Sequence, residues 1–372
     1  MRANLIIDNR KRGQALVPQN RSKTRVQIRE EKSKFSLSPE EEKLYGERFP
    51  AGYKKLKVLG RGGCAIVWLA EDSLTGKKVA VKQISRLSGS NAVDSCKREI
   101  HFGSLLNEIA HPALKSIARL LGSKSDKSDL WALYEVGGLS LSKALYHVKG
   151  EFVRGERIYL IEHPPLYEDF SHISTLRYFL KELLEIISVL SSMNIVHSDL
   201  KPDNILVSEG RYVGIKLIDF GSAYHFLGNG SISTATPEYM PPESLEKSHT
   251  PGDHIKELAL TSQPWSFDIW SVGMILLEII SGIPLWMSLK SRVLRHDKLI
   301  TCRGLLAAQG RDPGGIMRAQ IEITRDVSGI IKKVSAFDVP DSLCDLIEKM
   351  LKWDPMRRIS PAQALNHQFM TF

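Results

Sequence analysis

Residues 60–67 have the sequence GRGGCAIV, in which three of the first four residues are glycine. Because glycine has no side chain, the backbone N–H groups of such a segment can approach phosphate oxygens closely. The segment joins two stretches that alternate as β-strands do, whereas a dinucleotide-binding motif leads from a strand into a helix. The pattern favours a phosphate-binding loop between two strands, although paired glycines are more often simple turns.

A lysine follows in the next strand-like stretch, in the sequence VAVK at residues 79–82. Alternation along a strand puts Ala80 and Lys82 on one face and the two valines on the other. A lysine on that face could reach phosphates held beneath the glycine loop. A lone strand lysine is more often a solvated residue at a sheet edge, so this interpretation depends on the motifs that follow.

Five further motifs come later in the chain. They are HSDLKPDN at residues 197–204, DFG at 219–221, TPEYMPPE at 236–243, DIWSVG at 268–273 and DPMRRI at 354–359. Together with the glycine loop and the strand lysine, they resemble the signature set of the eukaryotic protein kinases in kind and in order. The resemblance covers about residues 53–370, and seven motifs in one order are far more specific than any one alone.

The resemblance implies an active Ser/Thr protein kinase that transfers the γ-phosphate of Mg-ATP to Ser or Thr hydroxyls of protein substrates. Lys82 would contact the α- and β-phosphates, and Lys201 would steady the γ-phosphate. Asp199 would be the catalytic base, while Asn204 and Asp219 would hold Mg²⁺ through oxygen ligands. A pseudokinase scaffold is the alternative, but a scaffold has no chemical need for this whole set of polar residues.

The same resemblance implies an ATP pocket with a hinge at residues 135–137 and a bulky residue, Tyr134, that closes the rear of the adenine site. The implied ATP-binding residues are Leu59, Gly60, Arg61, Gly62, Gly63, Cys64, Ala65, Val67, Ala80, Lys82, Tyr134, Glu135 and Gly137. The glutamate partner of Lys82 has two candidates. Glu99 matches the family pattern better, and Glu108 near the expected helix end is the alternative.

Other matches imply structural roles and an activation segment. Glu243 and Arg358 would form a buried ion pair, and Asp268 would tie down the catalytic loop. The segment 236–243 looks like the platform for a protein substrate. The activation-segment residues implied by the resemblance are Ser231, Ser233, Thr234, Thr236 and Glu243.

Two positions depart from the family pattern. Ala65 replaces the third glycine of the loop, and Ser198 stands where the family usually has arginine before the catalytic aspartate. That arginine often pairs with a phosphate on the activation segment. We therefore hypothesise that activity does not require phosphorylation of the three hydroxyl residues between 231 and 234.

The elements that must position these residues form two lobes. Ser38 looks like the cap of a short helix that ends near Glu47. The expected strands are residues 55–59, 65–71, 79–84, 118–122 and 130–136, with a helix at 92–107. Helical spacing follows at 176–190, then a strand pair at 205–207 and 215–218, and mainly helix and loop from about Trp265.

This order predicts an α+β, bilobal protein-kinase fold. A small antiparallel β-rich N-lobe (about 53–136) precedes a larger, mainly helical C-lobe (about 138–370), after a basic arm with a short helix at 1–52. Residues 147–173 and 288–338 exceed a minimal kinase. The second of these resembles the insert of the cyclin-dependent and mitogen-activated kinases. Both could hold ligand or partner sites, but surface loops tolerate insertion well, so the pattern favours tolerated surface insertions.

The chain has 372 residues and a net charge of +9. Residues 1–34 hold ten Lys or Arg against three Asp or Glu, so most of the excess charge lies in the arm. An acidic partner or an anionic membrane could bind this arm, and a solvated tail without a partner fits its composition at least as well. Nucleic acid is disfavoured because no aromatic residues interleave the charges. We expect no transmembrane segment, since the apolar stretch 269–280 is too short and fits a buried helix. Four scattered cysteines and no signal peptide favour the cytoplasm or nucleus.

Overall fold

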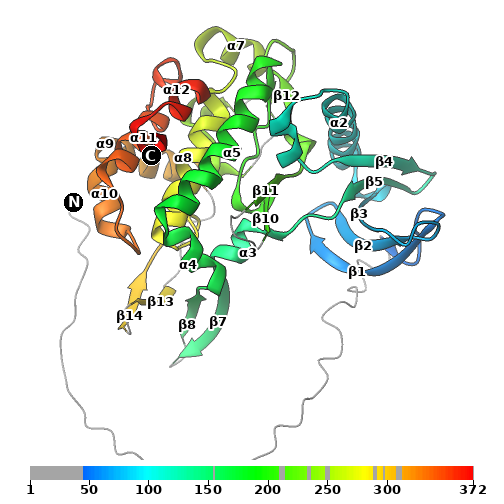
Figure 1. Cartoon of the computed structure of the whole chain (residues 1–372), viewed down its shortest axis with the longest axis horizontal. Coiled ribbons are helices and arrows are strands. Elements are labelled where there is room, and N and C mark those ends of the chain that lie inside the picture. The colour runs from blue at the N-terminus through cyan, green and yellow to red at the C-terminus, as the bar shows by residue number, and fades with distance from the viewer. Residues whose placement is uncertain are drawn as a thin grey trace, which may run out of the picture. The chain divides into compact units, whose positions relative to one another are not determined.

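The structure is a computed structural model that describes residues 45–153, 156–208, 214–232, 236–247, 252–287, 291–295, 298–306 and 312–371. The basic stretch 1–34 and the expected helix start at Ser38 lie outside these residues. Among the described residues, no helix is long and apolar enough to cross a membrane. The described elements confirm the α+β bilobal fold (Figure 1).

The small lobe is an antiparallel sheet of five strands in the order β1-β2-β3-β5-β4. A tight turn after β2 sets the register of β2 and β3, because Asp72 accepts from the N–H groups of Leu74 and Thr75, and Gly76 has a φ of 68°. The bounds are β1 Tyr53–Arg61, β2 Ile66–Asp72, β3 Lys78–Ser85, β4 Leu120–Ser125 and β5 Asp129–Glu135.

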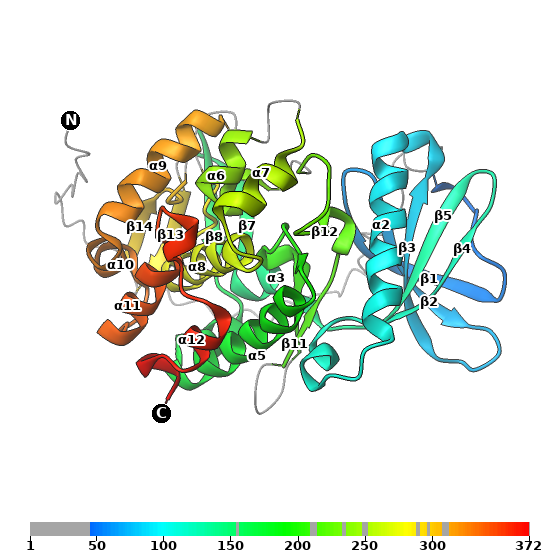
Figure 2. The same ribbon diagram turned by 90° about the horizontal axis from the view of Figure 1, so that it is seen from above.

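One long helix, α2 (Ser90–Asn107), lies beside this sheet (Figure 2). Its apolar residues Ala92, Val93 and Cys96 are buried together with Ile84 and Leu130 of the sheet. The short helices of this lobe are η1 (Arg86–Ser88) and η2 (Pro112–Ser116). Burial of one helix stripe against the sheet fixes which face of α2 meets the cleft.

Part of the stretch that we assigned to the arm packs on the small lobe. Tyr45 is buried, and Arg48 forms an ion pair of 2.6 Å with the buried Asp129. Lys55 of β1 lies over the ring of Phe49, 5.1 Å from its centroid. The compact unit that holds the described residues thus includes residues before Tyr53.

The large lobe is built around α5 (Ile173–Ser192) and α8 (Ser266–Ser281). Every residue of α8 is buried, as expected for the apolar stretch 269–280. The other helices are α3 (Leu141–Leu145), α4 (Pro165–Ser171), α6 (Pro242–Lys247), α7 (His254–Thr261), α9 (Pro313–Arg325), α10 (Val327–Val334), α11 (Asp341–Met350) and α12 (Pro361–Leu365). The 3₁₀ helices are η3 (Pro202–Asn204), η4 (Phe220–Ser222), η5 (Pro237–Tyr239), η7 (Pro355–Arg357) and η8 (Gln368–Met370).

Short strands carry the polar motifs at the face of this lobe. The strand β10 (Ile205–Ser208) pairs with β11 (Gly214–Leu217) and with β6 (Leu139–Ser140). The strand β9 (Ile195–Val196) pairs with β12 (Tyr224–His225). The expected strand pair at 205–207 and 215–218 is therefore present.

The two insertions fold together, which the sequence did not predict. The strands β7 (His147–Val153) and β8 (Glu156–Glu162) form a hairpin, as do β13 (Ser291–Arg295) and β14 (Lys298–Cys302). Because β13 pairs in parallel with β8, the four strands make one sheet, β14-β13-β8-β7 (Figure 1). Our expectation of mainly helix and loop after Trp265 was therefore wrong for this region.

Candidate active site

A cleft of about 800 Å³ lies beneath the glycine loop, which is the turn between β1 and β2. All thirteen residues that we predicted to bind ATP line this cleft. The turn is closed by a hydrogen bond of 2.9 Å from the Gly62 N–H to the Ala65 carbonyl. A Cβ atom at Gly60 or Gly63 would meet nothing within 4 Å, so the loop itself leaves the space beneath it open.

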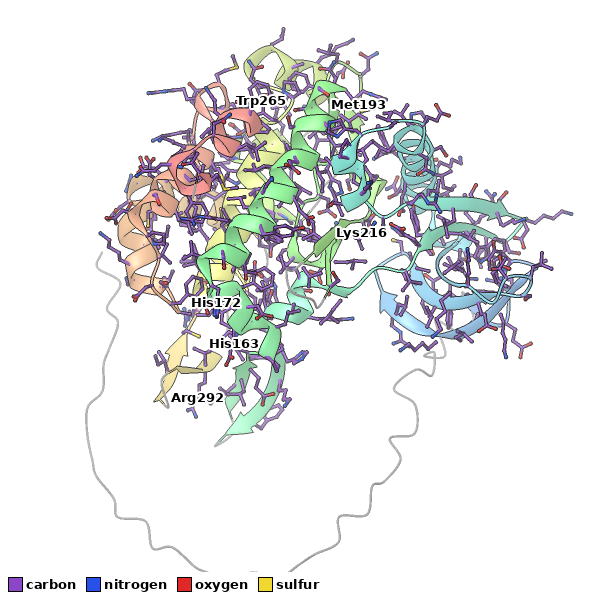
Figure 3. All side chains as sticks on the ribbon, viewed as in Figure 1. His163, His172, Met193, Lys216, Trp265 and Arg292 are labelled. Carbon is purple, nitrogen blue, oxygen red and sulfur yellow. The ribbon has the colours of Figure 1, made fainter. Side chains whose placement is uncertain are left out.

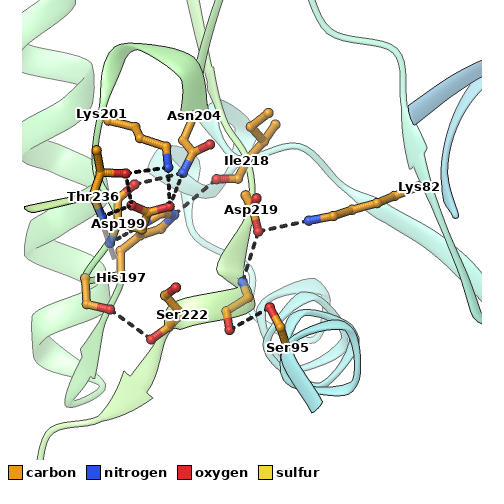
Figure 4. A network of polar contacts seen from close by, with 12 residues as sticks. Lys82, Ser95, His197, Asp199, Lys201, Asn204, Ile218, Asp219, Ser222 and Thr236 are labelled. Atoms are coloured by element: carbon orange, nitrogen blue, oxygen red, sulfur yellow. Dashed lines mark hydrogen bonds and ion pairs between the residues drawn. The ribbon is translucent and has the colours of Figure 1, made fainter. Parts of the chain in front are cut away.

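The lysine of β3 joins the two lobes at the floor of the cleft. The Lys82 ammonium lies 2.7 Å from Glu99 on α2. It lies 3.0 Å from Asp219, a contact drawn in Figure 4. Of the two glutamate candidates, the structure places Glu99 beside Lys82, while Glu108 lies just past the end of α2. Glu99 is only 3 % exposed.

The protonation of this triad follows from burial and mutual charge. Burial alone would lower the pKa of Lys82, but Asp219 and Glu99 together raise it above its ordinary value. Burial would raise the pKa of Asp219, but the Lys82 charge lowers it to about 2. Burial raises the pKa of Glu99, and Lys82 opposes this shift. The lysine and Asp219 are therefore charged at neutral pH.

The carboxylate of Asp199 is the centre of a second polar group, on the loop 197–204 that the family resemblance assigns as the catalytic loop (Figure 4). One oxygen accepts from Lys201 at 2.8 Å and from the Asn204 amide at 2.9 Å. The other accepts from the Thr236 hydroxyl at 3.1 Å. Lys201 also donates to the Thr236 hydroxyl at 2.7 Å, which brings the segment 236–243 to the catalytic loop.

Asp268 of α8 holds the backbone of this loop from below. Its two oxygens accept from the N–H groups of His197 at 2.9 Å and Ser198 at 3.0 Å. Ser198 has a φ of 60°, a left-handed conformation that costs energy for a residue with a side chain. Its hydroxyl donates to the Ser222 carbonyl at 2.8 Å, so the loop is tied directly to the DFG segment.

The DFG segment is also held by α2, through residues that the sequence analysis missed. The hydroxyl of Ser95 and the guanidinium of Arg98 each donate to the Gly221 carbonyl at 3.1 Å. A Cβ atom at Gly221 would lie 2.3 Å from the Ser95 hydroxyl oxygen, so a side chain there would displace the hydroxyl from its present position. No motif contains Ser95 or Arg98, and only their helical position relative to Glu99 could have suggested them.

The hinge runs close to the large lobe. A Cβ atom at Gly138 would lie 1.8 Å from the Val207 carbonyl oxygen, so the approach of this backbone requires glycine at position 138. Beside it, Glu135 accepts from Lys216 at 2.6 Å; Lys216 lies on β11 and is labelled in Figure 3.

A second cavity of about 540 Å³ is lined by Tyr134, Glu99 and Phe220. The bulk of Tyr134 thus does not fill the space behind the cleft.

The activation segment is only partly described. Ser231 is exposed, whereas Ser233 and Thr234 lie outside the described residues.

Arg358, whose side chain is fully buried, donates hydrogen bonds of 2.6 and 2.7 Å to the two oxygens of Glu243. Cys64 of the glycine loop is exposed. Among the described residues, no group of His, Cys, Asp or Glu has the arrangement of a metal cluster.

Comparison with known proteins agrees with this geometry. The family described as "Protein kinase domain" matches residues 53–370. The chain belongs to the protein kinase family. It is 29% identical over 343 residues to "Extracellular signal-regulated kinase 1" of Dictyostelium discoideum, covering 88% of this chain and 56% of that relative's length.

Two further relatives bear similar names. "Mitogen-activated protein kinase 10" of Arabidopsis thaliana is 28% identical, with 88% of this chain and 76% of the relative covered. "Mitogen-activated protein kinase hog1" of Botryotinia fuckeliana is also 28% identical, with 88% and 82% covered. The chain is thus a eukaryotic Ser/Thr protein kinase near the group that contains the mitogen-activated kinases, as its motifs had indicated.

Proposed function

We propose that this kinase transfers the γ-phosphate of Mg-ATP to Ser or Thr hydroxyls of proteins, with Asp199 as the catalytic base. The observation that carries the proposal is the meeting of Asp199, Lys201, Asn204 and Thr236 at one end of the cleft that Lys82 enters from the other lobe. A scaffold without phosphotransfer would have no use for such an arrangement.

The carboxylate of Asp199 is suited to receive and orient a hydroxyl. Its side chain is 12% exposed, so it can be reached from the cleft. The Thr236 hydroxyl donates to one of its oxygens at 3.1 Å, and this contact supports the proposal that a substrate β-hydroxyl can approach the same carboxylate. Asp199 would accept the proton of the substrate hydroxyl as that oxygen attacks, and Lys201 would offset the developing negative charge.

The cleft also fits the chemistry of ATP and its metal. Apolar residues such as Val67, Ala80 and Leu206 line the same cleft as the charged residues of the two polar groups. This combination suits an adenine ring joined to a triphosphate. The amide oxygen of Asn204 and the carboxylate of Asp219 are hard oxygen ligands that would hold Mg²⁺. When bound, Mg²⁺ neutralises phosphate charge and helps to align the reacting groups.

The test is transfer of labelled γ-phosphate from Mg-ATP to a generic basic protein, comparing the unaltered chain with Asp199→Asn. Loss of a general base typically lowers the rate about 10²- to 10⁴-fold, so we expect the mutant to lose at least about 99% of its activity. The control is Asp326→Asn, which makes the same chemical change at the cap of α10, where Asp326 accepts from the Gly329 N–H at 2.8 Å.

The label on the product should be found on Ser and Thr. Equal transfer by the unaltered chain and Asp199→Asn would refute the role of the carboxylate. Failure of the unaltered chain to transfer label, despite measurable Mg-ATP binding, would favour the scaffold alternative. The Asp326→Asn chain should retain the activity of the unaltered chain, because its change is confined to a helix cap outside the cleft.

A further inference from the structure

The Glu99 carboxylate has a partner on each oxygen. One oxygen accepts from Lys82 at 2.7 Å, and the other accepts from the hydroxyl of Tyr134 at 3.0 Å. The family resemblance implies that Tyr134 lines the ATP site and closes its rear by bulk. Its hydroxyl instead belongs to the same hydrogen-bonded group as the lysine that enters the cleft.

The sheet fixes the direction of this hydroxyl. Tyr134 lies on β5 directly opposite Ala80 of β3, and Lys82 lies opposite Ala132. Because Ala80 and Lys82 share a face of β3, the tyrosine and the lysine project from the same side of the sheet. The two alanines leave room for both long side chains. A rigid aromatic ring on an internal strand can therefore hold its hydroxyl at a set place relative to α2.

The burial of Glu99 makes a second hydrogen-bond donor to its carboxylate important for the charged form. Glu99 is 3 % exposed, and burial raises its pKa, which disfavours the charged form that Lys82 needs as a partner. The Lys82 charge and the Tyr134 hydroxyl both oppose this effect. An oxygen of a buried carboxylate that loses its donor has no ready replacement from water.

We propose that Tyr134 is a positioning residue of the phosphate site: its hydroxyl orients Glu99, and through Glu99 it sets the Lys82 ammonium that meets the nucleotide phosphates. Tyr134 need not touch the phosphates itself for this role. The inference rests on the proposed function, because it assigns Lys82 to nucleotide phosphates.

The experiment is a double-mutant cycle on Mg-ATP binding. The dissociation constant is measured for the unaltered chain, Tyr134→Phe, Glu99→Gln and the double variant. Phenylalanine keeps the ring and removes only the hydroxyl. Because the Tyr134 hydroxyl donates to a charged carboxylate, its removal in Tyr134→Phe should weaken Mg-ATP binding about tenfold. In the Glu99→Gln background, the same change should weaken binding less than about twofold, because the charged acceptor is already gone.

A matched control and a second readout separate positioning from a purely structural effect. Tyr167→Phe removes another tyrosine hydroxyl, which donates to the Ile279 carbonyl at 3.1 Å in the large lobe. It should leave Mg-ATP binding unchanged. For Tyr134→Phe, KM for Mg-ATP should rise about tenfold while KM for the protein substrate stays within about twofold.

An unchanged dissociation constant for Tyr134→Phe would overturn the inference, as would an equal loss in both Glu99 backgrounds. Thermal melting of each variant shows that the measured proteins are folded. Absence of Mg-ATP binding by the unaltered chain would refute the proposed function itself. If the unaltered chain and Tyr134→Phe bind Mg-ATP with the same dissociation constant, only the role given to Tyr134 is refuted.

Discussion

Arg358 has a bonding pattern that makes its replacement a sharp test of how the large lobe is held together. A guanidinium group has five N–H donors. Two donate to the oxygens of Glu243, at 2.6 and 2.7 Å. The others donate to the carbonyls of Lys352 at 2.9 Å, Ser266 at 3.0 Å and Trp353 at 3.2 Å. Every donor is used, so no other side chain can replace it fully.

The expected cost of Arg358→Met follows from what is left behind. The variant keeps a long apolar side chain, so packing near the Trp270 ring is largely preserved. It leaves Glu243 without its charged partner in a site where only 16% of that side chain is exposed. Breaking a buried ion pair by removing one partner costs about 3–5 kcal/mol. Because water partly reaches the Glu243 carboxylate, we expect a loss of unfolding free energy near the lower end of this range, at about 3 kcal/mol.

The assay is equilibrium unfolding in denaturant. The midpoint should fall without a change in slope for Arg358→Met. Arg357→Met is the matched control, because Arg357 is the exposed neighbour and should change stability by less than about 0.5 kcal/mol. Glu243→Gln combined with Arg358→Met should cost less than the sum of the single changes. A cost for Arg358→Met below about 1 kcal/mol, or strict additivity, would refute this reasoning.

Three further predictions concern pH, substrate and regulation. Burial raises the pKa of the Glu278 carboxyl from 4.5 to about 7 in the folded protein. Its contribution to the free energy of unfolding, about 3 kcal/mol, is therefore fully present below about pH 4.5. That contribution is lost as the pH rises through 7. Glu278→Gln should flatten this decline in unfolding free energy. The buried Gln320 amide donates to the Met240 carbonyl at 2.8 Å, so Gln320→Met should raise KM for the protein substrate about three- to tenfold and leave KM for Mg-ATP unchanged. Activity should persist, within about threefold, after replacement by alanine of Ser231, Ser233 and Thr234.

Each of these has a contrary outcome. Parallel stability profiles for the unaltered chain and Glu278→Gln between pH 4.5 and 7 would contradict the role of Glu278. A rise in KM for Mg-ATP equal to that for the protein would show that Gln320→Met disturbs the whole lobe. Abolished activity in a folded triple-alanine chain would show that a phosphate is needed after all.

The site could be predicted from the sequence where short linear motifs carry it. Lys82, Asp199 and Asp219 lie in three separate motifs, and the cleft brings them together because the fold is shared by a family. The strands of the small lobe were also readable, since alternation and a turn at residues 75–76 are local signals. A sequence shows directly only those patterns whose residues lie close together along the chain.

Contacts between distant segments could not be predicted in this way. Nothing near Tyr134 in the sequence shows that its hydroxyl reaches Glu99, which is 35 residues away. The same holds for Ser95, whose partner is the backbone carbonyl of Gly221. The β8–β13 pairing was missed because alternation identifies a strand but not its neighbour, and a parallel pair can join strands far apart.

The start of the sheet formed by the two insertions is linked to the segment 236–243 by a shared carboxylate. Tyr146 immediately precedes β7, and its hydroxyl donates to one oxygen of Glu278. The hydroxyl of Tyr239, in the segment 236–243, donates to the other oxygen. Glu278 is fully buried on α8, so the loss of either tyrosine donor would remove a hydrogen bond that water cannot readily replace. A displacement of β7 that moved Tyr146 would therefore carry an energetic cost at the same carboxylate that accepts from Tyr239, so the start of the first insertion is coupled to the segment 236–243 through α8.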